Sequence, residues 1–581
     1  MYDRSSSCPI SSPVWPLRSE PHHIPHIRNP SAPCVRALVP VFALIAGLAS
    51  SCAKDPPSTA VEYSGSVGTG PDWNADVDHV AFTIDPGHRG RPISPLIYGY
   101  NAISDPGARG VGALRAGGNR FTAYNWENNA SNAGNDYMFQ NDGYLVRGSS
   151  SPESPGEAIR PTLVTAGQIG ATAIVTIPIV DYVSADKQPP GNVMSSGSDY
   201  LATRFKQNKP TRGTAPVAGV APDITDAFVY EDEFVAWVGA EFPGLPVAFS
   251  LDNEPDLWSQ THKEVHPAAL TYDELVMRNI EYAAAIKAVR PDAPVLGFVS
   301  YGWQGYLSLQ AAPDAGPKGN FIDYYLKQMK AAESTHGRRL VDTLDLHWYP
   351  EATGIGAGGA TVRITGADTS PGVVEARVQA PRSLWDPGYL EQSWVAGSAG
   401  GPIALVPRIE GQIARDYPGT KLGFSEWNYG GGNDISGAVA TADVLGIFGR
   451  EGVGLANVWP SGSEPFTETA VAIYRSYDGA GARFGDTAVS AVTSSIRSSS
   501  VYAAVDAANP GRLVIVAINK RTIPTTATIA ISGDPTRTSA AVWVVSGSSP
   551  AIAVAPALSA SQPGTFTYEM PALSVSVIVP S

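Results

Sequence analysis

The stretch that decides the fold runs from residue 246 to residue 299 and contains two short apolar runs on either side of one helical pattern. It begins with PVAFSLDNEP (246–255), continues to TYDELVMRNIEYAAAIKAVR (271–290) and ends with VLGFV (295–299). In the middle segment apolar residues recur at the three- and four-residue steps of an amphipathic α-helix, namely Leu275, Val276, Ile280, Ala283, Ile286 and Val289. Thr271 and Glu274 form a capping box, and Pro291 ends the pattern. The stretch therefore predicts a strand, a helix over 272–290 and a second strand.

The same alternation continues on both sides of this stretch, from about residue 95 to about residue 460. Eight short apolar runs are expected to form strands: 97–100, 113–119, 172–179, 246–251, 295–299, 343–347, 422–425 and 455–459. Residues 435–450 carry a further helical pattern, whereas so few residues separate the first two runs that we expect a degenerate first helix. Eight alternations of strand and helix predict an α/β fold, a (β/α)8 TIM-like barrel rather than an open sheet.

Beyond residue 485 the composition changes to Ala, Val, Ser and Thr in alternating runs separated by turn residues, which is typical of a β-sandwich. The run 79–84 is expected to add a strand to that domain. The expected organisation is an export segment (1–52), a flexible linker (53–78), an N-terminal strand joining the β-sandwich (79–95), a catalytic (β/α)8 barrel (96–484) and a C-terminal all-β sandwich domain (485–581).

Composition narrows the class of ligand. The chain of 581 residues carries 40 Lys and Arg against 54 Asp and Glu, for a formal net charge of −14. Because affinity for nucleic acid depends largely on Lys and Arg that neutralise phosphates, an acidic balance argues against a nucleic-acid partner. A neutral polymer or a small uncharged ligand fits the composition better.

The N-terminal residues resemble an export signal. Thirteen apolar residues, 37–49, follow Arg36; this run is too short to span a bilayer but suits a secretory signal. Ser50-Ser51-Cys52 resembles a bacterial lipoprotein processing site, so Cys52 is the expected lipidation site; the alternative is an ordinary signal cleaved near Ala49. All three cysteines lie at or before Cys52, so the exported part has no disulfide. We expect a bacterial cell-surface lipoprotein or a secreted protein, in contact with a membrane only through this lipid.

Two glutamates lie where predicted barrel strands end, which is where barrel enzymes place their reacting groups. Glu254 precedes Pro255, which cannot donate to a sheet ladder, and Glu426 closes the run Gly423-Phe-Ser-Glu426. A pair of carboxyls at one barrel mouth suits cleavage of a glycosidic bond, since one donates a proton while the other attacks the anomeric carbon or activates water. Asn253 could offer its amide to a sugar hydroxyl. For either acid alone, a structural carboxylate is the plainer alternative.

Further candidates for substrate binding accompany these acids. Aromatic rings at or after strand ends suit stacking on sugars, although core packing is an equal alternative; they are Trp126, Trp258, Trp348, Tyr349, Trp427, Tyr429 and Trp459. His347 could hydrogen-bond the nucleophile or a hydroxyl, and Arg115 could steady the charge of the nucleophile, unless both are structural. Asn119, Asn125 and Glu127, in the loop after the second strand, could bind sugar hydroxyls or brace that loop.

Four longer motifs resemble glycoside hydrolase family 44: residues 115–134, 251–258, 345–350 and 424–431, with the helix at 440–452 in agreement. The resemblance runs from about residue 79 to the C-terminus. It implies a (β/α)8-like catalytic domain with a β-sandwich, retention of anomeric configuration and endo-cleavage of β-1,4-glucans including xyloglucan. It also implies Glu254 as the acid/base and Glu426 as the nucleophile. A structural calcium ion is compatible with the family, without assigned ligands, and no redox or organic cofactor is implied.

Three functions are therefore compatible with the sequence. The first is an endo-β-1,4-glucanase acting on cellulosic glucan or xyloglucan, and we expect it to be a monomer. The second keeps the barrel and both acids but acts on xylan or mannan, since the positions of the acids do not encode which sugar hydroxyls are axial. The third is a surface lipoprotein that binds glycans without cutting them.

Overall fold

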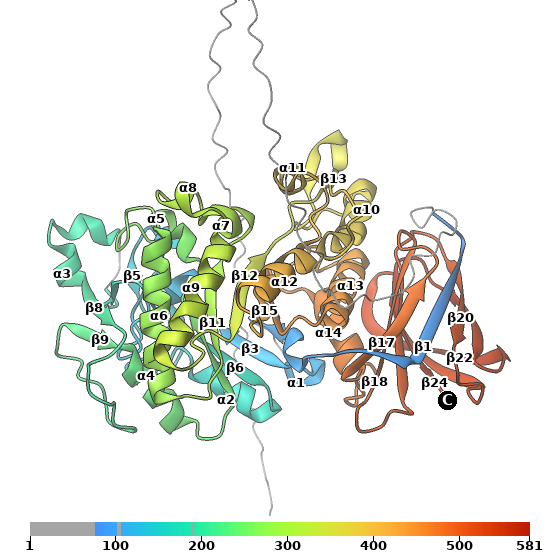
Figure 1. Ribbon diagram of the computed structural model, residues 1–581, viewed down its shortest axis with the longest axis horizontal. Coiled ribbons are helices and arrows are strands. Elements are labelled where there is room, and N and C mark those ends of the chain that lie inside the picture. The colour runs from blue at the N-terminus through green and yellow to red at the C-terminus, as the bar shows by residue number, and fades with distance from the viewer. Residues whose placement is uncertain (1–75, 102–105, 189–190) are drawn as a thin grey trace, which may run out of the picture. The chain divides into compact units, whose positions relative to one another are not determined.

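Eight parallel strands close into a barrel in the computed structural model, which describes residues 76–101, 106–188 and 191–581 (Figure 1). The strands are β2 (Gly99–Tyr100), β3 (Ala113–Ala116), β6 (Thr172–Ile177), β10 (Val247–Leu251), β11 (Val295–Ser300), β12 (Thr343–Trp348), β15 (Lys421–Trp427) and β16 (Leu455–Val458). They are neighbours in chain order, and β16 pairs with β2 to close the ring. All eight expected runs form these strands, and the prediction of a TIM-like barrel is confirmed.

Helices follow most of the strands and cover the outside of the barrel (Figure 1). The longer ones are α2 (Arg160–Ile169), α4 (Glu231–Glu241), α6 (Tyr272–Val289), α9 (Phe321–His336), α10 (Pro371–Gln379), α12 (Leu405–Asp416), α13 (Ile435–Glu451) and α14 (Pro465–Arg475). Helix α6 begins where the sequence predicted, because the Thr271 hydroxyl accepts a hydrogen bond from the Glu274 backbone N–H at 3.2 Å. Between β2 and β3 the structure describes only the four-residue α1 (Pro106–Arg109), so the first helix is degenerate, as expected.

Shorter elements lie in the connections. They are the helices α3 (Tyr200–Arg204), α5 (Trp258–Thr261), α7 (Trp303–Ser308), α8 (Ala315–Lys318) and α11 (Trp394–Ala399), and the small sheets β4–β5 (Ser131–Asn132, Asn141–Asp142), β7–β8–β9 (Tyr182–Ser184, Phe205–Lys209, Phe228–Tyr230) and β13–β14 (Thr353–Ile355, Thr361–Arg363). Most of them belong to the connections that follow the carboxyl ends of the barrel strands. They therefore surround the end of the barrel where its candidate acids lie.

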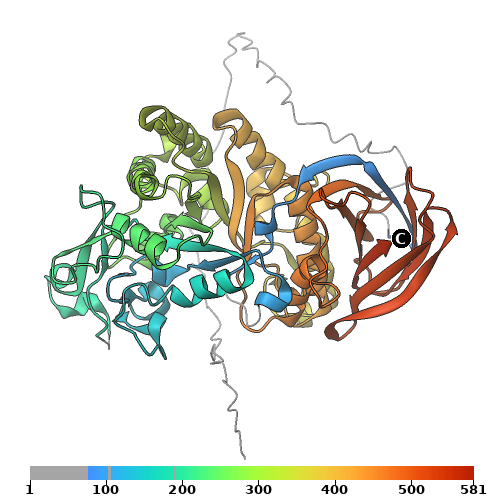
Figure 2. The ribbon, with the colours of Figure 1, turned by 90° about the horizontal axis from the view of Figure 1, so that it is seen from below.

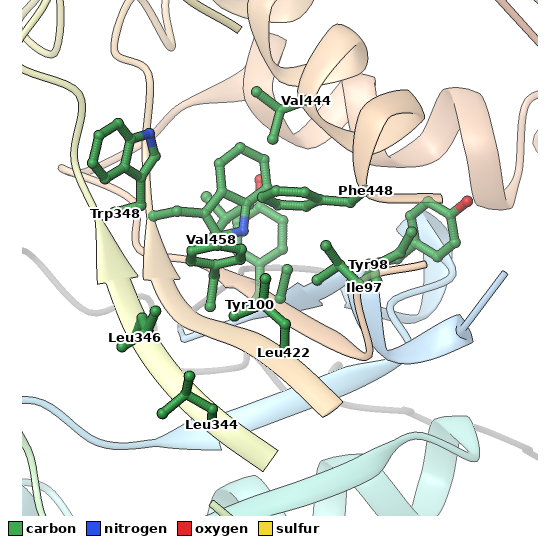
Figure 3. Close-up of a cluster of buried hydrophobic side chains, with 14 of the residues drawn as sticks. Ile97, Tyr98, Tyr100, Leu344, Leu346, Trp348, Leu422, Val444, Phe448 and Val458 are labelled. Atoms are coloured by element: carbon green, nitrogen blue, oxygen red, sulfur yellow. The ribbon is translucent and has the colours of Figure 1, made fainter. Parts of the chain in front are cut away.

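Alternation along each barrel strand separates two environments. On β12, Leu344, Leu346 and Trp348 pack outward among apolar side chains that include Phe448 of α13 (Figure 3). The residues between them, Asp345 and His347, face the opposite side, which is the interior of the barrel.

The barrel interior changes from apolar to polar along the strands. A separate apolar cluster is formed by one residue from each of five strands: Ala113, Ile174, Ala248, Leu296 and Leu455. Two positions further along four of these strands, on the same face, the side chains are polar or charged: Arg115, Thr176, Ser250 and Asn457. The apolar layer closes the barrel, and the polar layer beyond it forms the floor of the candidate site.

The C-terminal domain is all-β, as expected. Its eight strands and β1, which precedes the barrel, form one hydrogen-bonded ring of nine strands. The order around the ring is β1 (His79–Pro92), β17 (Thr487–Thr493), β18 (Ser499–Val505), β19 (Leu513–Asn519), β24 (Ser574–Pro580), β21 (Ser539–Ser546), β22 (Ser549–Gln562), β23 (Thr565–Met570) and β20 (Thr525–Ile531). Strand β1 pairs antiparallel with β17 and parallel with β20, so Phe82 lies between Thr493 and Ile529. Both views show this blue strand among the red ones (Figure 1, Figure 2).

A buried ion pair joins the barrel to this ring. Lys520 Nζ lies 2.7 Å from Asp443 Oδ2 of α13, and the Tyr502 hydroxyl donates to Asp443 Oδ1 at 2.6 Å. All three side chains are buried. The ring of Tyr502 also covers Gly446, where an added Cβ would lie 2.3 Å from it. Burial lowers the pKa of Lys520, and Asp443 opposes that shift.

Lys520→Met is expected to lower the free energy of unfolding by about 3–5 kcal/mol, because it leaves the Asp443 carboxylate buried without its cation. Urea unfolding monitored by tryptophan fluorescence measures this effect. The matched control is Lys520→Met combined with Asp443→Asn, which removes both charges and should recover much of the loss. A single variant as stable as the parent would show that the pair does not stabilise the contact.

The export segment 1–52, its Cys52 and nearly all of the expected linker 53–78 lie outside the described residues. Within the part of the chain that the structure describes, every helix is too short or too polar to cross a membrane.

Candidate active site

Glu254 and Glu426 lie at the carboxyl ends of β10 and β15 and come together at the barrel mouth. A carboxylate oxygen of each and a ring nitrogen of His347 all lie within 4.8 Å of one another. Glu426 belongs to β15, whereas Glu254 follows β10 in a short left-handed loop, with φ of 70° at Asp252 and 47° at Glu254. The Glu254 N–H donates to the carbonyl of Val299, next to the end of β11, at 3.0 Å. Such backbone strain at non-glycine residues is typical of functional sites.

His347 links the two acids. Its Nδ1 lies 2.8 Å from Glu254 Oε1 and 3.5 Å from Glu426 Oε2, and its Nε2 lies 3.2 Å from the Ser425 hydroxyl. Burial lowers the pKa of His347, but the Glu426 and Glu254 carboxylates outweigh burial and raise it above its usual value. The Nδ1–H therefore donates to Glu254, and the charged ring lies within ion-pair distance of Glu426.

Arg115 holds Glu426 from the floor of the site. Its Nη1 donates to Glu426 Oε1 at 2.8 Å and to Asn101 Oδ1 at 3.1 Å, and its Nη2 donates to Asn253 Oδ1 at 2.9 Å. The guanidinium is buried, so these charge-assisted bonds are strong. They fix the Glu426 carboxylate and turn the NH2 group of Asn253 away from Arg115.

Tyr349 holds the second oxygen of Glu426. Its hydroxyl donates to Glu426 Oε2 at 2.9 Å. Burial, and then the negative charge of Glu426, raise the pKa of Tyr349 well above its usual value, so the hydroxyl stays a neutral donor. Both oxygens of Glu426 are therefore hydrogen-bonded, one to Arg115 and one to Tyr349.

Tyr349→Phe is expected to lower kcat about 10- to 100-fold, because a hydrogen bond to a charged group contributes about 1.5–3 kcal/mol. Initial rates on a soluble β-glucan measure this change. Circular dichroism serves as the control, since phenylalanine keeps the ring and its packing. A variant with the parent kcat would show that the hydroxyl does not orient Glu426.

The connection after β10 is also held by an acid that the sequence did not single out. Asp256 Oδ2 accepts a 2.6 Å hydrogen bond from the Ser300 hydroxyl and one from the Tyr301 N–H at 3.3 Å, both at the end of β11. Burial raises the pKa of Asp256 to about 7, and the charge of Glu254 adds to the rise. Asp256 thus joins the segment that carries Glu254 to the neighbouring strand. In the sequence, the one feature that pointed to Asp256 was its position two residues after Glu254.

The exit loop of β3 is braced from within. Asn125 is fully buried and donates to the Ser184 carbonyl at 2.9 Å, while its Oδ1 accepts from the Glu127 N–H at 3.0 Å. Glu127 Oε2 lies 2.8 Å from Lys206 Nζ, and burial raises the pKa of Glu127 to about 7 despite this cation. Of the two roles expected for Asn125 and Glu127, the structure shows the bracing one.

Asn119 in the same loop is held by a buried charged pair. His262 Nε2 lies 2.8 Å from the Asn119 carbonyl, and His262 Nδ1 lies 2.8 Å from Glu264 Oε1. Since both partners are acceptors, the imidazole carries a proton on each nitrogen. Asn119 Nδ2 donates to the Ala133 carbonyl at 3.3 Å, and the residue is partly exposed.

Five of the aromatic residues expected to stack on sugars are core residues. No more than 2% of Trp126, Trp258, Trp348, Trp427 or Tyr429 is exposed. Trp126 stacks on Phe234 at 5.3 Å, Trp258 packs against His266 at 5.3 Å, Trp427 meets Phe448 edge-on at 5.6 Å, and the Trp348 indole N–H donates to the Tyr429 hydroxyl at 3.1 Å. Sugar contact is therefore wrong for these five.

Strand alternation explains this correction for Trp348 and Trp427. They directly follow His347 and Glu426 on β12 and β15, so they point to the opposite face, toward the helices. Trp459 and Tyr349, in contrast, are partly exposed. The ring of Trp459 covers Gly118, where an added Cβ would lie 2.5 Å from it.

The group Glu254, His347 and Glu426 is also the one place among the described residues where three His, Cys, Asp or Glu side chains bring ligand atoms this close. It does not fit calcium, which prefers six to eight oxygen ligands. One of the three groups is an imidazole, and the Arg115 guanidinium already occupies Glu426 Oε1. The calcium ion implied by the resemblance therefore remains without assigned ligands.

A barrel whose mouth holds two carboxyls, one fixed by an arginine and a tyrosine and the other by a histidine, is the site of a glycoside hydrolase. The comparisons with known proteins agree. A model of glycoside hydrolase family 44 matches residues 130–352. Endoglucanase A of Paenibacillus lautus is 40% identical over 526 residues, which cover 87% of this chain and 73% of that protein. The chain belongs to glycoside hydrolase family 44.

Solved structures of the same family share the whole fold. The family 44 endoglucanase Cel44A from Clostridium thermocellum superposes with a TM-score of 0.81 at 37% identity, covering 87% of this chain and 100% of the other. The family 44 xyloglucanase of Paenibacillus polymyxa, solved with xyloglucan, gives a TM-score of 0.81 at 38% identity, covering 87% and 99%.

Proposed function

We propose that this protein is an endo-acting hydrolase that cleaves the backbone of β-1,4-glucans, including xyloglucan, with retention of anomeric configuration. The observation that carries the proposal is the convergence of Glu254 and Glu426 on one imidazole, with carboxylate oxygens within 4.8 Å of one another. Retaining enzymes place their carboxyls about 5–5.5 Å apart, whereas inverting enzymes keep about 6.5–9.5 Å for a water. The observed spacing supports the retaining class.

In the first step Glu426 attacks the anomeric carbon. The bond from this carbon to the glycosidic oxygen breaks, and Glu254 gives its proton to the departing oxygen, which leaves a glycosyl ester on Glu426. Arg115 and Tyr349 hold Glu426 as an oriented carboxylate before the attack. Glu254, whose side chain is 23% exposed, has access to the leaving group and to solvent.

In the second step a water attacks the same carbon while Glu254 takes its proton. The ester bond breaks, and Glu426 returns as a carboxylate. Glu254 acts as a base in this step because it gave up its proton in the first one. The two inversions leave the sugar with its original configuration.

The substrate class follows from the relatives and the surface of the site. Two of the relatives are named as endoglucanases and one as a xyloglucanase. Trp459 and Tyr349 are the expected aromatic contacts that stay partly exposed, and the NH2 group of Asn253, turned away from Arg115, is available to a sugar hydroxyl. An uncharged polysaccharide also suits a protein with a net charge of −14.

The decisive experiment is digestion of a polysaccharide panel, with cellulosic glucan, xyloglucan, xylan and mannan in parallel. Early products of many lengths from the glucans support endo-cleavage of β-1,4-glucan. Proton NMR of the first products should show the β-anomer before mutarotation. Initial α-anomer would overturn retention, exclusive activity on xylan or mannan would overturn the substrate, and no activity on any member would overturn the hydrolase proposal.

We also propose that the protein is exported and acts as a monomer, with Cys52 as a lipid attachment site. A polysaccharide is too large to enter a cell, so an enzyme that cuts it internally must work outside. The apolar run 37–49 and Ser50-Ser51-Cys52 support export. Labelling of producing cells with a tagged fatty acid tests the lipid: label that disappears in Cys52→Ser supports it, and an unlabelled parent protein contradicts it.

A further inference from the structure

Asp345 is a fully buried acid on the floor of the site, and the catalytic steps above do not use it. It lies on β12 with 0% of its surface exposed, on the interior face that also carries His347. Its Oδ1 accepts a 2.9 Å hydrogen bond from the Ser425 N–H, whereas its Oδ2 has no hydrogen-bond partner among the described residues. Burial raises the pKa of Asp345, and the cations His347 and Arg115 oppose the rise.

Ser425 connects this acid to the histidine. The Ser425 backbone N–H is held by Asp345, and its hydroxyl lies 3.2 Å from His347 Nε2. The other ring nitrogen, Nδ1, faces Glu254 and Glu426. The imidazole therefore lies between the two reacting carboxyls on one side and the Ser425–Asp345 pair on the other.

Ionisable side chains from several neighbouring elements surround His347. β3 contributes Arg115, β15 contributes Glu426, and the end of β10 contributes Glu254 and Asp256. β12 contributes Asp345, and Tyr349 directly follows this strand. α7 contributes Tyr306, whose hydroxyl donates to the His347 carbonyl. The connection after β11 adds Tyr301. Burial is the largest cause that raises the pKa of each of the three tyrosines, Tyr301, Tyr306 and Tyr349. The tyrosines are neutral, and Asp256, with a pKa of about 7, is mainly uncharged in mildly acidic solution.

Five groups around His347 decide the charge of the site once the tyrosines and Asp256 are set aside. The cations are Arg115 and protonated His347, and the acids are Glu426, Asp345 and Glu254. If Glu254 holds its proton, two positive charges face two negative ones. In the glycosyl ester Glu426 has lost its charge while Glu254 has gained one, so the balance is again two against two. A buried charge is costly without a partner, so this equality favours both states of the cycle.

We propose that Asp345 is a positioning residue for the hydrolysis proposed above: its carboxylate is the constant negative charge that keeps His347 protonated and balances the site through both steps. The proposal rests on that proposed function. Asp345 acts through Ser425, His347 and Arg115 and touches no substrate.

Asp345→Asn tests the charge with little change of shape, because the amide oxygen can still accept from the Ser425 N–H. The variant leaves the site with an excess of positive charge, which stabilises the ionised forms of both Glu254 and Glu426. Both limbs of the kcat/KM–pH profile should therefore move to lower pH, by about one pH unit each. On the alkaline side kcat should fall about tenfold, while KM stays within about twofold because the cleft surface is unchanged.

A second readout does not depend on activity. The chain has nine histidines, so the 15N imidazole spectrum is sparse, and the His347 signal is identified by its loss in His347→Gln. Its pKa should fall by about one unit in Asp345→Asn, because a neighbouring negative charge has been removed. Asp345→Ser, which is smaller and also neutral, is the second variant and should show the same shifts if the asparagine variant does not fold.

Asp443→Asn is the matched control, since it neutralises another buried acid, at the contact with the β-ring. It should lower stability and leave the pH limbs in place. An active parent whose limbs and His347 pKa are the same in the Asp345 variants would overturn the inference. A loss of kcat that is equal at every pH would also overturn it, since that indicates a structural role. An inactive parent would defeat the proposed function, whereas the NMR titration would still decide the role of Asp345.

Discussion

Glu426→Gln is expected to lower kcat/KM on β-1,4-glucan by at least about 10⁴-fold, because an amide cannot form the glycosyl ester. Glutamine has the same shape and keeps an oxygen for Arg115, so the thermal unfolding temperature should stay close to that of the parent. Reducing-sugar release over long incubations measures the residual rate. Activity above about one per cent of the parent in a purified sample would contradict the assignment of the nucleophile.

Glu426→Gly sharpens this test. Removing the side chain leaves space beside the anomeric carbon on the face that Glu426 attacks. Added azide should then react there with an activated aryl glycoside and give a glycosyl azide of inverted configuration. A glycosyl azide of retained configuration from this variant would show that another group forms the covalent intermediate.

Glu254→Ala is expected to lose about 10²- to 10⁴-fold on polysaccharide, since its proton no longer reaches the leaving oxygen. On a glycoside with a dinitrophenyl leaving group the first step needs no acid, so its rate should fall far less. Azide should speed release of the intermediate and give a product of retained configuration, opposite to that from Glu426→Gly. The alkaline limb of the pH profile should disappear.

Equal losses on both substrates would contradict an acid/base role for Glu254. Glu375→Gln is a suitable control for the loss of a glutamate carboxylate as such. Glu375 is an exposed residue of α10 that pairs with Arg497 at 2.7 Å. It should behave as the parent on both substrates.

Much of the barrel could be predicted from the sequence because its determinants are local. Each apolar run and each helical pattern, such as that over 272–290, is complete within about twenty residues. The order of the strands around a (β/α)8 barrel follows the order in the chain, so the count of eight was enough to predict closure. The run 79–84 was expected to add a strand to the C-terminal domain, but its two partner strands and the closure into a ring were not predictable in this way. Phe82 pairs with Thr493 and Ile529 across more than four hundred residues.

The site residues also fall into those that a local sequence pattern predicts and those that depend on contacts between distant strands. Six site residues were predicted from their places on barrel strands or at strand ends, and the structure brings them together: Glu254, Glu426, Arg115, Asn253, His347 and Tyr349. The error over Trp348 and Trp427 arose from reading position at a strand end as exposure at the mouth, whereas adjacent residues of a strand face opposite sides. Ser425 and Asp345 were missed because their roles depend on contacts with neighbouring strands that no local pattern reveals. For Asp256 the one local indication was its position two residues after Glu254.

The position of β1 has a consequence for biosynthesis. The ribosome completes this strand before any residue of the barrel emerges, yet the two strands that flank it, β17 and β20, are made only after the barrel is finished. The ring therefore cannot close until the C-terminal strands have been made, and until then both edges of β1 lack their partner strands. A gene truncated after β16 would give a barrel preceded by an orphan strand and without its Lys520 contact, so the β-ring is not a module that can be trimmed away.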